Sequence, residues 1–105
     1  MKGTTYGERV VEIARAIPAG RVVTYGDICK AAGGAPMAAQ GVSGILGRAY
    51  EKGITDIPWH RIVYANGKVW LSEAYAAERL RLYKKEGIAL DSKNRIVNFE
   101  DIRGF

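Results

Sequence analysis

The chain has 105 residues, of which 48% are hydrophobic and 26% are charged. This length and balance predict one packed globular domain over residues 1–105 and argue against wholesale disorder. Lys and Arg number 16 against 11 Asp and Glu, giving a net charge of +5 that favours a polyanionic partner such as nucleic acid. The charge by itself leaves open that this basic surface binds no anion.

The cysteine and histidine counts exclude two kinds of structural cross-link. Cys29 is the only cysteine and His60 the only histidine, so an internal disulfide is excluded and a four-ligand zinc site cannot be assembled from them. We therefore expect no metal and no cofactor.

No stretch reaches the roughly 20 apolar residues that span a bilayer, and the first residues carry no apolar signal-peptide core. These features predict a soluble, cytoplasmic protein (nuclear in a eukaryote) without a membrane partner.

The first third of the chain predicts two capped helices. Thr5-Tyr6-Gly7-Glu8 has the form of a capping box, and Pro18-Ala19-Gly20 ends the helix that it opens. The apolar residues of this helix recur at helical spacing: Val10, Ile13, Ala14 and Ile17. After a short extended segment, Thr24-Tyr25-Gly26-Asp27 predicts a second cap and a short helix that Gly33-Gly34 breaks.

A third helix is predicted from Pro36, which suits a first turn, to about Leu46. Two short helices joined by a glycine turn indicate a helix-turn-helix, although a plain αα-hairpin gives the same pattern. Much of the third helix and its approach is nearly bare of side chains, with small residues at Ala35, Ala38, Ala39, Gly41 and Ser43. A bare helix can enter the narrow minor groove, whereas tight packing inside the core is the equally compatible alternative.

The middle of the chain predicts a β-hairpin. A loop over residues 50–56 leads into Ile57-Pro58-Trp59-His60-Arg61-Ile62-Val63. Asn66-Gly67 is typical of a type I′ turn, and we expect it to join strands over residues 62–64 and 68–71. Trp70, on the second of these strands, is expected either as the roof of a pocket or as a core residue.

The last third predicts a helix and a second hairpin. Ser72 is expected to cap a helix that runs through Tyr83 and is ended by Gly87. Residues 88–90 and 95–99 could then pair across a polar turn. The predicted fold is mostly α with a small β-hairpin, built around one helix-turn-helix.

Several separated segments together resemble one known family. Pro18 to Ile28, the small-residue helix, Ile57 to Val63 and the closing Glu86-Gly87 are similar to the DNA-binding domain of O6-alkylguanine-DNA alkyltransferases, in the same order and spacing. The resemblance covers about residues 6–90 and leaves 91–105 as a C-terminal extension, expected to be a solvated tail. It implies a helix-turn-helix domain (winged-helix-like) of the alkyltransferase C-terminal type that contacts the minor groove.

One departure from the family pattern bears directly on function. Alkyltransferases carry a nucleophilic cysteine within Pro-Cys-His-Arg, and this chain has Pro58-Trp59-His60-Arg61. The transfer needs a thiolate, which indole cannot supply. The resemblance therefore implies an alkyltransferase-like protein that is not an enzyme. Such a monomeric protein would bind O6-alkylguanine in double-stranded DNA, flip the base and mark it for nucleotide excision repair proteins.

Three rival interpretations remain at this point, of which one, a protein–protein adaptor without DNA contact, fits the basic charge poorly. Cys29, beside Lys30 on the first helix of the pair, could be a nucleophile, but its predicted position lies away from the lesion pocket. The chain could also be a helix-turn-helix regulator without lesion preference. That alternative leaves the segment from Pro58 to Arg61 without a role.

The resemblance also implies a role for individual residues. Tyr25 would crowd a phosphate and rotate the damaged nucleotide outward, and Gln40 stands where the family has an arginine finger that fills the vacated stack. Trp59 would form one wall of the lesion pocket. His60 and Glu86, with no thiol to activate, are expected to support a hydrogen-bond network.

Three more residues complete the expected lesion pocket. Arg61 is expected to steady the O6 side of the base, and the carbonyl of Ile62 to accept from the guanine amino group. Ser72 replaces a pocket tyrosine of the transferases, which predicts tolerance of alkyl groups larger than methyl.

Overall fold

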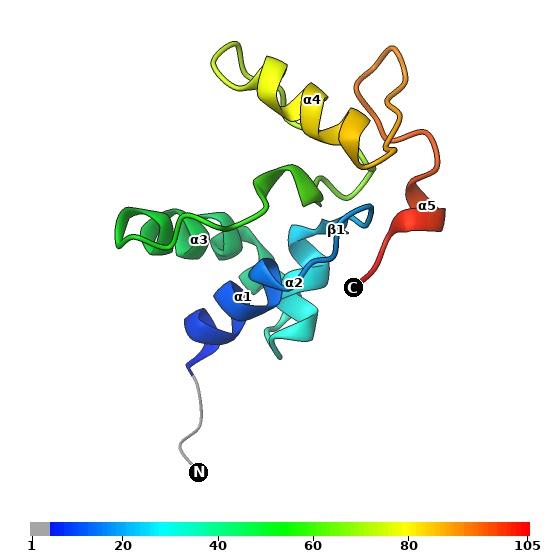
Figure 1. The fold of residues 1–105 in the computed structure, drawn as a ribbon. Coiled ribbons are helices and arrows are strands. Elements are labelled where there is room, and N and C mark those ends of the chain that lie inside the picture. Colours follow the sequence, from blue (N-terminus) through cyan, green and yellow to red (C-terminus); the bar gives the residue numbers. More distant parts are fainter. Residues whose placement is uncertain (1–4) are drawn as a thin grey trace.

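The computed structural model describes residues 5–105; residues 1–4, where the sequence predicts no signal-peptide core, lie outside the described part. Its elements in chain order are α1 (Tyr6–Arg15), β1 (Val23–Thr24), α2 (Tyr25–Ala31), the 3-10 helix η1 (Pro36–Gly41), α3 (Val42–Glu51), the 3-10 helix η2 (Trp59–Arg61), β2 (Ile62–Val63), α4 (Ala76–Lys85) and α5 (Phe99–Ile102). Helices α1, α2 and α3 form one group, α4 lies on the opposite side of η2 from them, and α5 lies beside β1 (Figure 1). Within residues 5–105 no helix is both long and apolar enough to cross a bilayer.

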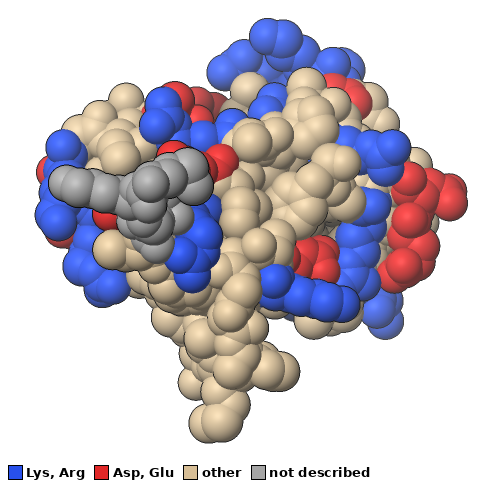
Figure 2. Space-filling view, turned by 90° about the horizontal axis from the view of Figure 1, so that it is seen from below, with Lys and Arg blue, Asp and Glu red and all other residues tan. Residues whose placement is uncertain are grey.

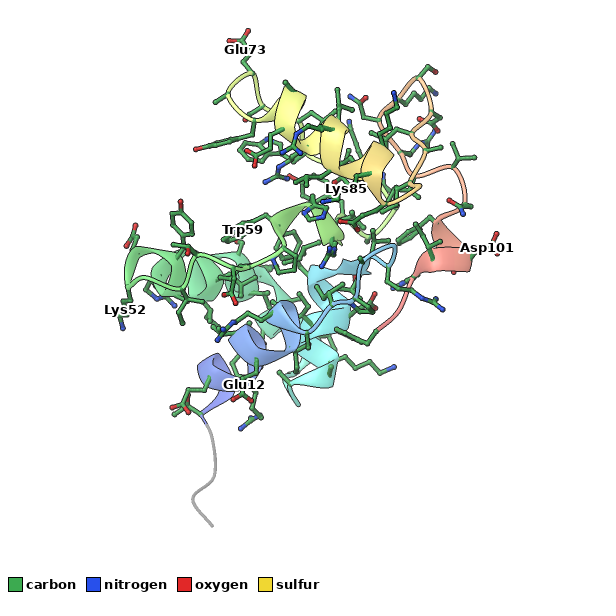
Figure 3. All side chains as sticks on the ribbon, viewed as in Figure 1. Glu12, Lys52, Trp59, Glu73, Lys85 and Asp101 are labelled. Carbon is green, nitrogen blue, oxygen red and sulfur yellow. The ribbon has the colours of Figure 1, made fainter. Side chains whose placement is uncertain are left out.

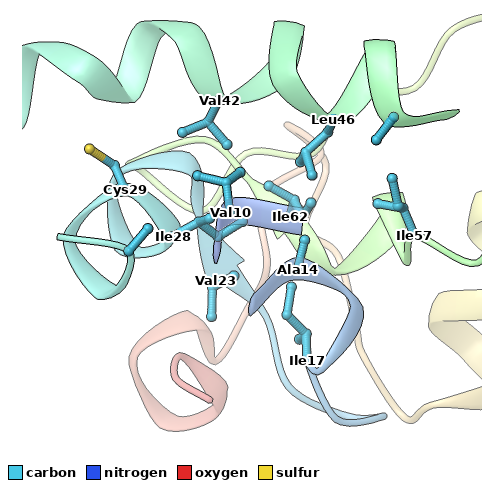
Figure 4. Packing of buried hydrophobic residues seen from close by; sticks show 12 residues of the cluster. Val10, Ala14, Ile17, Val23, Ile28, Cys29, Val42, Leu46, Ile57 and Ile62 are labelled. Atoms are coloured by element: carbon cyan, nitrogen blue, oxygen red, sulfur yellow. The ribbon is translucent and has the colours of Figure 1, made fainter. Parts of the chain in front are cut away.

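Helices α1, α2 and α3 begin where local chemistry dictates and pack through their apolar faces. The Thr5 hydroxyl accepts from the N–H of Glu8, and Thr24 and Asp27 form a reciprocal capping box, as the sequence predicts. The buried residues between these helices include Val10, Ile28 and Leu46 (Figure 4). Burying side chains of this kind stabilises the fold by roughly 1.5–3 kcal/mol each.

The sheet consists of two short parallel strands that join distant parts of the chain. Val23 pairs with Ile62 and Thr24 with Val63. Because β1 leads directly into α2 and β2 follows directly from η2, this pairing fixes the start of α2 against η2. The prediction that residues 62–64 and 68–71 pair as the two strands of a hairpin is therefore wrong, since the strand that pairs with β2 is β1.

The turn at Asn66-Gly67 is present but is not of the predicted type. Gly67 has a φ of +80°, whereas Asn66 keeps a negative φ, and a type I′ turn needs both to be positive. Two backbone bonds close the turn: the N–H of Tyr64 donates to the carbonyl of Lys68 at 3.0 Å, and the N–H of Gly67 donates to the carbonyl of Tyr64 at 2.8 Å. Lys68 then forms a bridge with Arg95.

The third helix differs from its prediction at both ends. Its first part, η1, is a 3-10 helix, and the α-helix begins only at Val42 and continues to Glu51. The small residues Ala38 and Ala39 and the exposed Gln40 therefore lie on η1, ahead of α3. The loop predicted over residues 50–56 begins correspondingly later.

Helix α4 ends as predicted but starts later. Gly87 has a φ of +74°. The N–H of Ile88 donates to the carbonyl of Tyr83, and the N–H of Gly87 donates to the carbonyl of Lys84. Together these features form a Schellman motif. At the other end Ser72 is not the N-cap, because α4 begins at Ala76. The carbonyl of Ser72 instead accepts from the N–H groups of residues 75 and 76 in a preceding turn.

The C-terminal extension is part of the folded structure, so its prediction as a solvated tail is wrong. The expected second hairpin is confirmed as a bridge between Leu90 and Ile96, after which residues 99–102 form α5 rather than a strand. Ile96 is buried in a second cluster with Val22 and Val63. The chain ends beside α2 (Figure 1), where Arg103 forms a parallel bridge with Val22.

Candidate nucleic-acid interface

Tyr25 is presented by the start of α2. Thr24 caps this helix, so Tyr25 is its first residue, and the ring is half-buried against the first cluster of core residues. Its ring centroid lies 6.4 Å from that of Tyr64. Burial raises the pKa of Tyr25, the neighbouring Tyr64 raises it further, and Arg79 opposes both. The phenol is therefore a neutral hydrogen-bonding group at physiological pH.

A small cavity of about 110 Å³ brings three of the predicted pocket residues together. It is lined by Tyr25, Trp59, Ile62, Val63, Tyr64, Trp70 and Arg79. Trp59 comes from η2 and Ile62 from β2, and the β1–β2 pairing holds both against the start of α2. Four aromatic residues, Tyr25, Trp59, Tyr64 and Trp70, thus line one hollow, an arrangement suited to a flat ring.

A larger cavity of about 550 Å³ adjoins the first and lies between α3 and α4. Trp59, Trp70 and Arg79 line both hollows, and Trp59 lies between the two helices (Figure 3). The Arg79 guanidinium lies 5.4 Å from the centre of the Trp70 ring and donates to the Trp70 carbonyl at 3.2 Å. Tyr50 on α3 adds another aromatic wall.

Behind Trp59, a buried carboxylate fixes the two residues that follow it. Glu86 accepts from His60 Nε2 at 2.6 Å, from Arg61 Nε and Nη2 at 3.0 and 2.9 Å, and from the N–H of Gly20 at 2.9 Å. Burial acts to raise the pKa of Glu86, but the bonds from Arg61, Gly20 and His60 lower it to about 2. The expected His60–Glu86 network is confirmed, and it anchors η2.

Two predicted pocket residues lie outside both cavities. The Arg61 guanidinium points away from the hollow toward Glu86 and the Ile17 carbonyl, which it reaches at 3.0 Å. A buried carboxylate captures it, so Arg61 is not placed to steady the O6 side of a base. The Ser72 hydroxyl is buried without a hydrogen-bond partner among residues 5–105 and does not line either cavity.

The segment expected to meet DNA presents a largely uncharged surface. Gln40 is exposed on η1, and the other small residues named for this surface are Ala35, Ala38, Ala39, Gly41 and Ser43. Ala38 and Ala39 are partly buried and pack against the core, which supports the core-packing alternative for these two residues. From below the view of Figure 1, Lys and Arg side chains flank a broad uncharged area (Figure 2).

Arg48 brings a cation to the same helix as Ser43. A Cβ built on Gly44 would lie 3.4 Å from Arg48 Nη1, so the guanidinium folds back over the bare glycine. It has neither a hydrogen-bond nor an ion-pair partner within the described part of the chain. Arg48 is the one basic residue of α3 (Val42–Glu51).

Cys29 lies away from both cavities. The side chain is buried and Sγ donates to the Ala35 carbonyl at 3.2 Å. Within residues 5–105 no group of three or more metal-ligating side chains is assembled.

Sequence reasoning missed three residues that line the smaller cavity: Val63, Tyr64 and Arg79. Val63 is the last residue of the recognised segment from Ile57 to Val63 and Tyr64 directly follows it, so their proximity was available as a signal. Arg79 comes from α4, and no local pattern could place it over Trp70.

The capped α2, the small-residue entry to α3 and the aromatic hollow at η2 define a helix-turn-helix DNA-binding domain. Residues 5–88 match the family described as "6-O-methylguanine DNA methyltransferase, DNA binding domain", and the chain belongs to this family. It is 38% identical over 95 residues to the "DNA base-flipping protein" of Escherichia coli K12, covering 90% of this chain and 71% of the relative.

Catalytic relatives share a smaller part of their length with this chain. The "Methylated-DNA--protein-cysteine methyltransferase" of Methanothermobacter thermautotrophicus is 30% identical over 90 residues, which are 86% of this chain and 48% of that protein.

Among solved structures, S. pombe Atl1 in complex with damaged DNA containing O6-carboxymethylguanine has a TM-score of 0.72 at 24% identity, covering 100% of this chain and 99% of that one. The O6-methylguanine methyltransferase of Mycobacterium tuberculosis has a TM-score of 0.59 at 27% identity, over 81% of this chain and 50% of that one.

Proposed function

We propose that this protein is a non-enzymatic sensor that binds O6-alkylguanine in double-stranded DNA and flips the damaged base out of the stack. The observation that carries the proposal is the shared cavity of Tyr25, Trp59 and Ile62 on a fold of the alkyltransferase DNA-binding family. Relatives named base-flipping proteins, and the fold of a protein seen bound to damaged DNA, support it.

The chemistry of the cavity supports binding without transfer. Alkyl transfer forms a carbon–sulfur bond and needs a thiolate that can reach the base. Trp59 occupies the position between Pro58 and His60, where the family carries its cysteine, and an indole ring is not such a nucleophile. Cys29, the chain's one thiol, is buried against the Ala35 carbonyl.

The geometry supports separate roles for Tyr25 and Trp59 in base flipping. Tyr25, on the capped start of α2, crowds the backbone phosphate, and Trp59 stacks on the extruded base. Unstacking a base costs a few kcal/mol, and contact with an aromatic side chain returns roughly 1–3 kcal/mol. A guanine that alkylation on O6 has already weakened in its pairing would therefore be flipped more readily than an intact one.

Gln40 takes the intercalating role that the family gives to an arginine. Its amide donates and accepts hydrogen bonds, so it can pair with the orphaned cytosine without a charge. We assign the pocket to Tyr25, Trp59 and Ile62, with Arg61 acting from behind through Glu86.

Because the protein leaves the alkyl group on the base, a second system must remove it. We propose that the bound lesion is handed to nucleotide excision repair proteins. Incision of a plasmid carrying one O6-alkylguanine by purified excision nuclease should be faster with the protein present, and unchanged incision would count against this step.

A competition titration at fixed salt tests the central proposal. One duplex carries a single O6-methylguanine and the other an intact guanine in the same sequence. We expect a preference of about tenfold or more for the damaged duplex, which is roughly 1.4 kcal/mol. Equal affinities would refute lesion sensing and leave a helix-turn-helix regulator as the better explanation.

A further inference from the structure

We propose that Arg103, in the C-terminal extension, is a positioning residue that holds Tyr25 in place by clamping the start of α2 through Asp27. The proposal rests on the proposed function, because it concerns how Tyr25 is held when it presses on DNA. Arg103 lies outside the part of the chain that matches the family, residues 5–88.

A continuous set of short contacts joins Arg103 to the start of α2. Arg103 Nε and Nη2 each donate to one carboxylate oxygen of Asp27 at 2.9 Å. The same carboxylate accepts from the backbone N–H of Thr24 at 3.0 Å, and the N–H of Asp27 donates to the Thr24 hydroxyl at 2.9 Å. Tyr25 lies between these two residues, so the capping box that defines its position is braced by the guanidinium from outside.

The backbone around Arg103 is itself tied to the strand that leads into Tyr25. The N–H of Val22 donates to the Ile102 carbonyl at 3.0 Å, and the N–H of Gly104 donates to the Val22 carbonyl at 2.9 Å. The strand is therefore flanked by the extension on one side and by β2 on the other. The extension acts as a strap across the segment that precedes α2.

The strap is anchored in the core rather than held by the ion pair alone. Ile102 packs against the second cluster, and the Arg103 guanidinium lies 5.3 Å from the centre of the Phe99 ring. Phe99 in turn packs directly on Gly67, where a Cβ would come within 2.9 Å of its ring. Arg103 is thus presented to Asp27 from a fixed support.

A clamp at this point matters because base flipping loads Tyr25. Pushing a phosphate aside exerts an equal reaction on the first turn of α2, and a helix end is where a helix frays most readily. The Arg103–Asp27 bonds oppose that fraying, because opening the first turn would break the capping box and the ion pair together. Losing Arg103 should therefore weaken flipping more than it weakens contact with intact DNA.

A double-mutant cycle between Arg103→Ala and Tyr25→Ala in the full chain tests the coupling. Affinities for the O6-methylguanine duplex and the intact duplex give the lesion preference, and a fluorescent adenine analogue beside the lesion reports unstacking. Arg95→Ala is the matched control, since Arg95 lies in the same extension and pairs with Asp91 rather than Asp27. Asp27→Asn, which keeps an oxygen for the Thr24 N–H, is the second variant, and melting curves verify that each variant is folded.

We expect Arg103→Ala to lower the lesion preference about three- to fivefold, the upper end for a partly exposed ion pair, with nearly unchanged affinity for intact DNA. Asp27→Asn should act in the same direction, Arg95→Ala should have no effect, and Arg103→Ala should add nothing in the Tyr25→Ala background.

Three results would overturn the proposal and leave the proposed function standing. Arg103→Ala could leave the lesion preference unchanged, or its effect could persist undiminished without Tyr25. An equal loss on both duplexes with a shallower salt dependence would make Arg103 a phosphate contact instead. A wild-type protein without any lesion preference would overturn the proposed function, and this inference with it.

Discussion

Glu86→Gln should lower the free energy of unfolding by about 3 kcal/mol at neutral pH. The carboxylate is 7% exposed and accepts from His60, Arg61 and the N–H of Gly20. Burial acts to raise its pKa, and these donors lower it from the ordinary 4.5 to about 2. A tenfold change in proton affinity corresponds to about 1.4 kcal/mol, so the ionised form contributes about 3 kcal/mol more than a neutral group.

The same lowered pKa determines the pH dependence of stability. Because the folded-state pKa lies below the unfolded value of 4.5, the contribution of Glu86 is fully present above that value. It is lost as the pH falls from 4.5 through about 2. The wild type should therefore lose stability across this acidic interval, and Glu86→Gln should lose correspondingly less.

Urea unfolding followed by tryptophan fluorescence measures both effects, at neutral pH and along an acid series. Asp56→Asn is the control, because Asp56 pairs with Arg15 on the surface, where the two side chains are 61% and 46% exposed. This ion pair should contribute under about 1 kcal/mol to the free energy of unfolding. The reasoning is refuted if Glu86→Gln costs no more than Asp56→Asn, or if the acid dependence of the variant equals that of the wild type.

Four other predictions follow from the site and its surroundings. Trp59→Ala should reduce the lesion preference by about fivefold to a hundredfold in the competition titration, whereas Trp59→Phe should keep most of it. Arg48→Ala should reduce the slope of log affinity against log salt by about 0.9, the value of one phosphate contact. Gly34→Ala should destabilise the fold by about 1–3 kcal/mol in urea unfolding, because the new methyl group would lie 2.8 Å from Cys29 Sγ and from Tyr6 Cε1. Duplexes with O6-alkyl groups larger than methyl should bind, since a cavity of about 550 Å³ adjoins the smaller one.

Each of these has a result that would contradict it. A Trp59→Ala protein with full lesion preference would remove the indole from the pocket. An unchanged salt slope, with Arg95→Ala as the comparison, would show that Arg48 does not reach a phosphate. Wild-type stability in Gly34→Ala would mean that the neighbouring side chains move aside freely. Rejection of larger adducts would mean that the two hollows do not act together.

Features set by neighbouring residues were predictable from the sequence. The capping boxes at Thr5 and Thr24 and the end of α4 at Gly87 depend on side chains and dihedral angles within one turn, and they are confirmed. The resemblance added the grouping of Tyr25 with Trp59, which no local pattern could supply.

Features set by distant partners were not predictable. Asn66-Gly67 favoured a local hairpin, but β2 pairs with β1, whose Val23 and Thr24 lie far upstream. The tail resembled solvated chain because its anchoring contacts with Val22 and Asp27 are equally remote. The orientation of Arg61 was not predictable for the same reason, since its guanidinium bonds to the Glu86 carboxylate at the end of α4.

The most direct test of lesion sensing without transfer is to analyse the complex itself. The protein is mixed with a duplex containing one O6-methylguanine, the complex is isolated by size exclusion, and both components are recovered after denaturation. We predict an unchanged protein mass and complete recovery of O6-methylguanine from the DNA. A protein heavier by one methyl group in place of a hydrogen, with intact guanine in the recovered DNA, would contradict the account and make Cys29 the residue to examine.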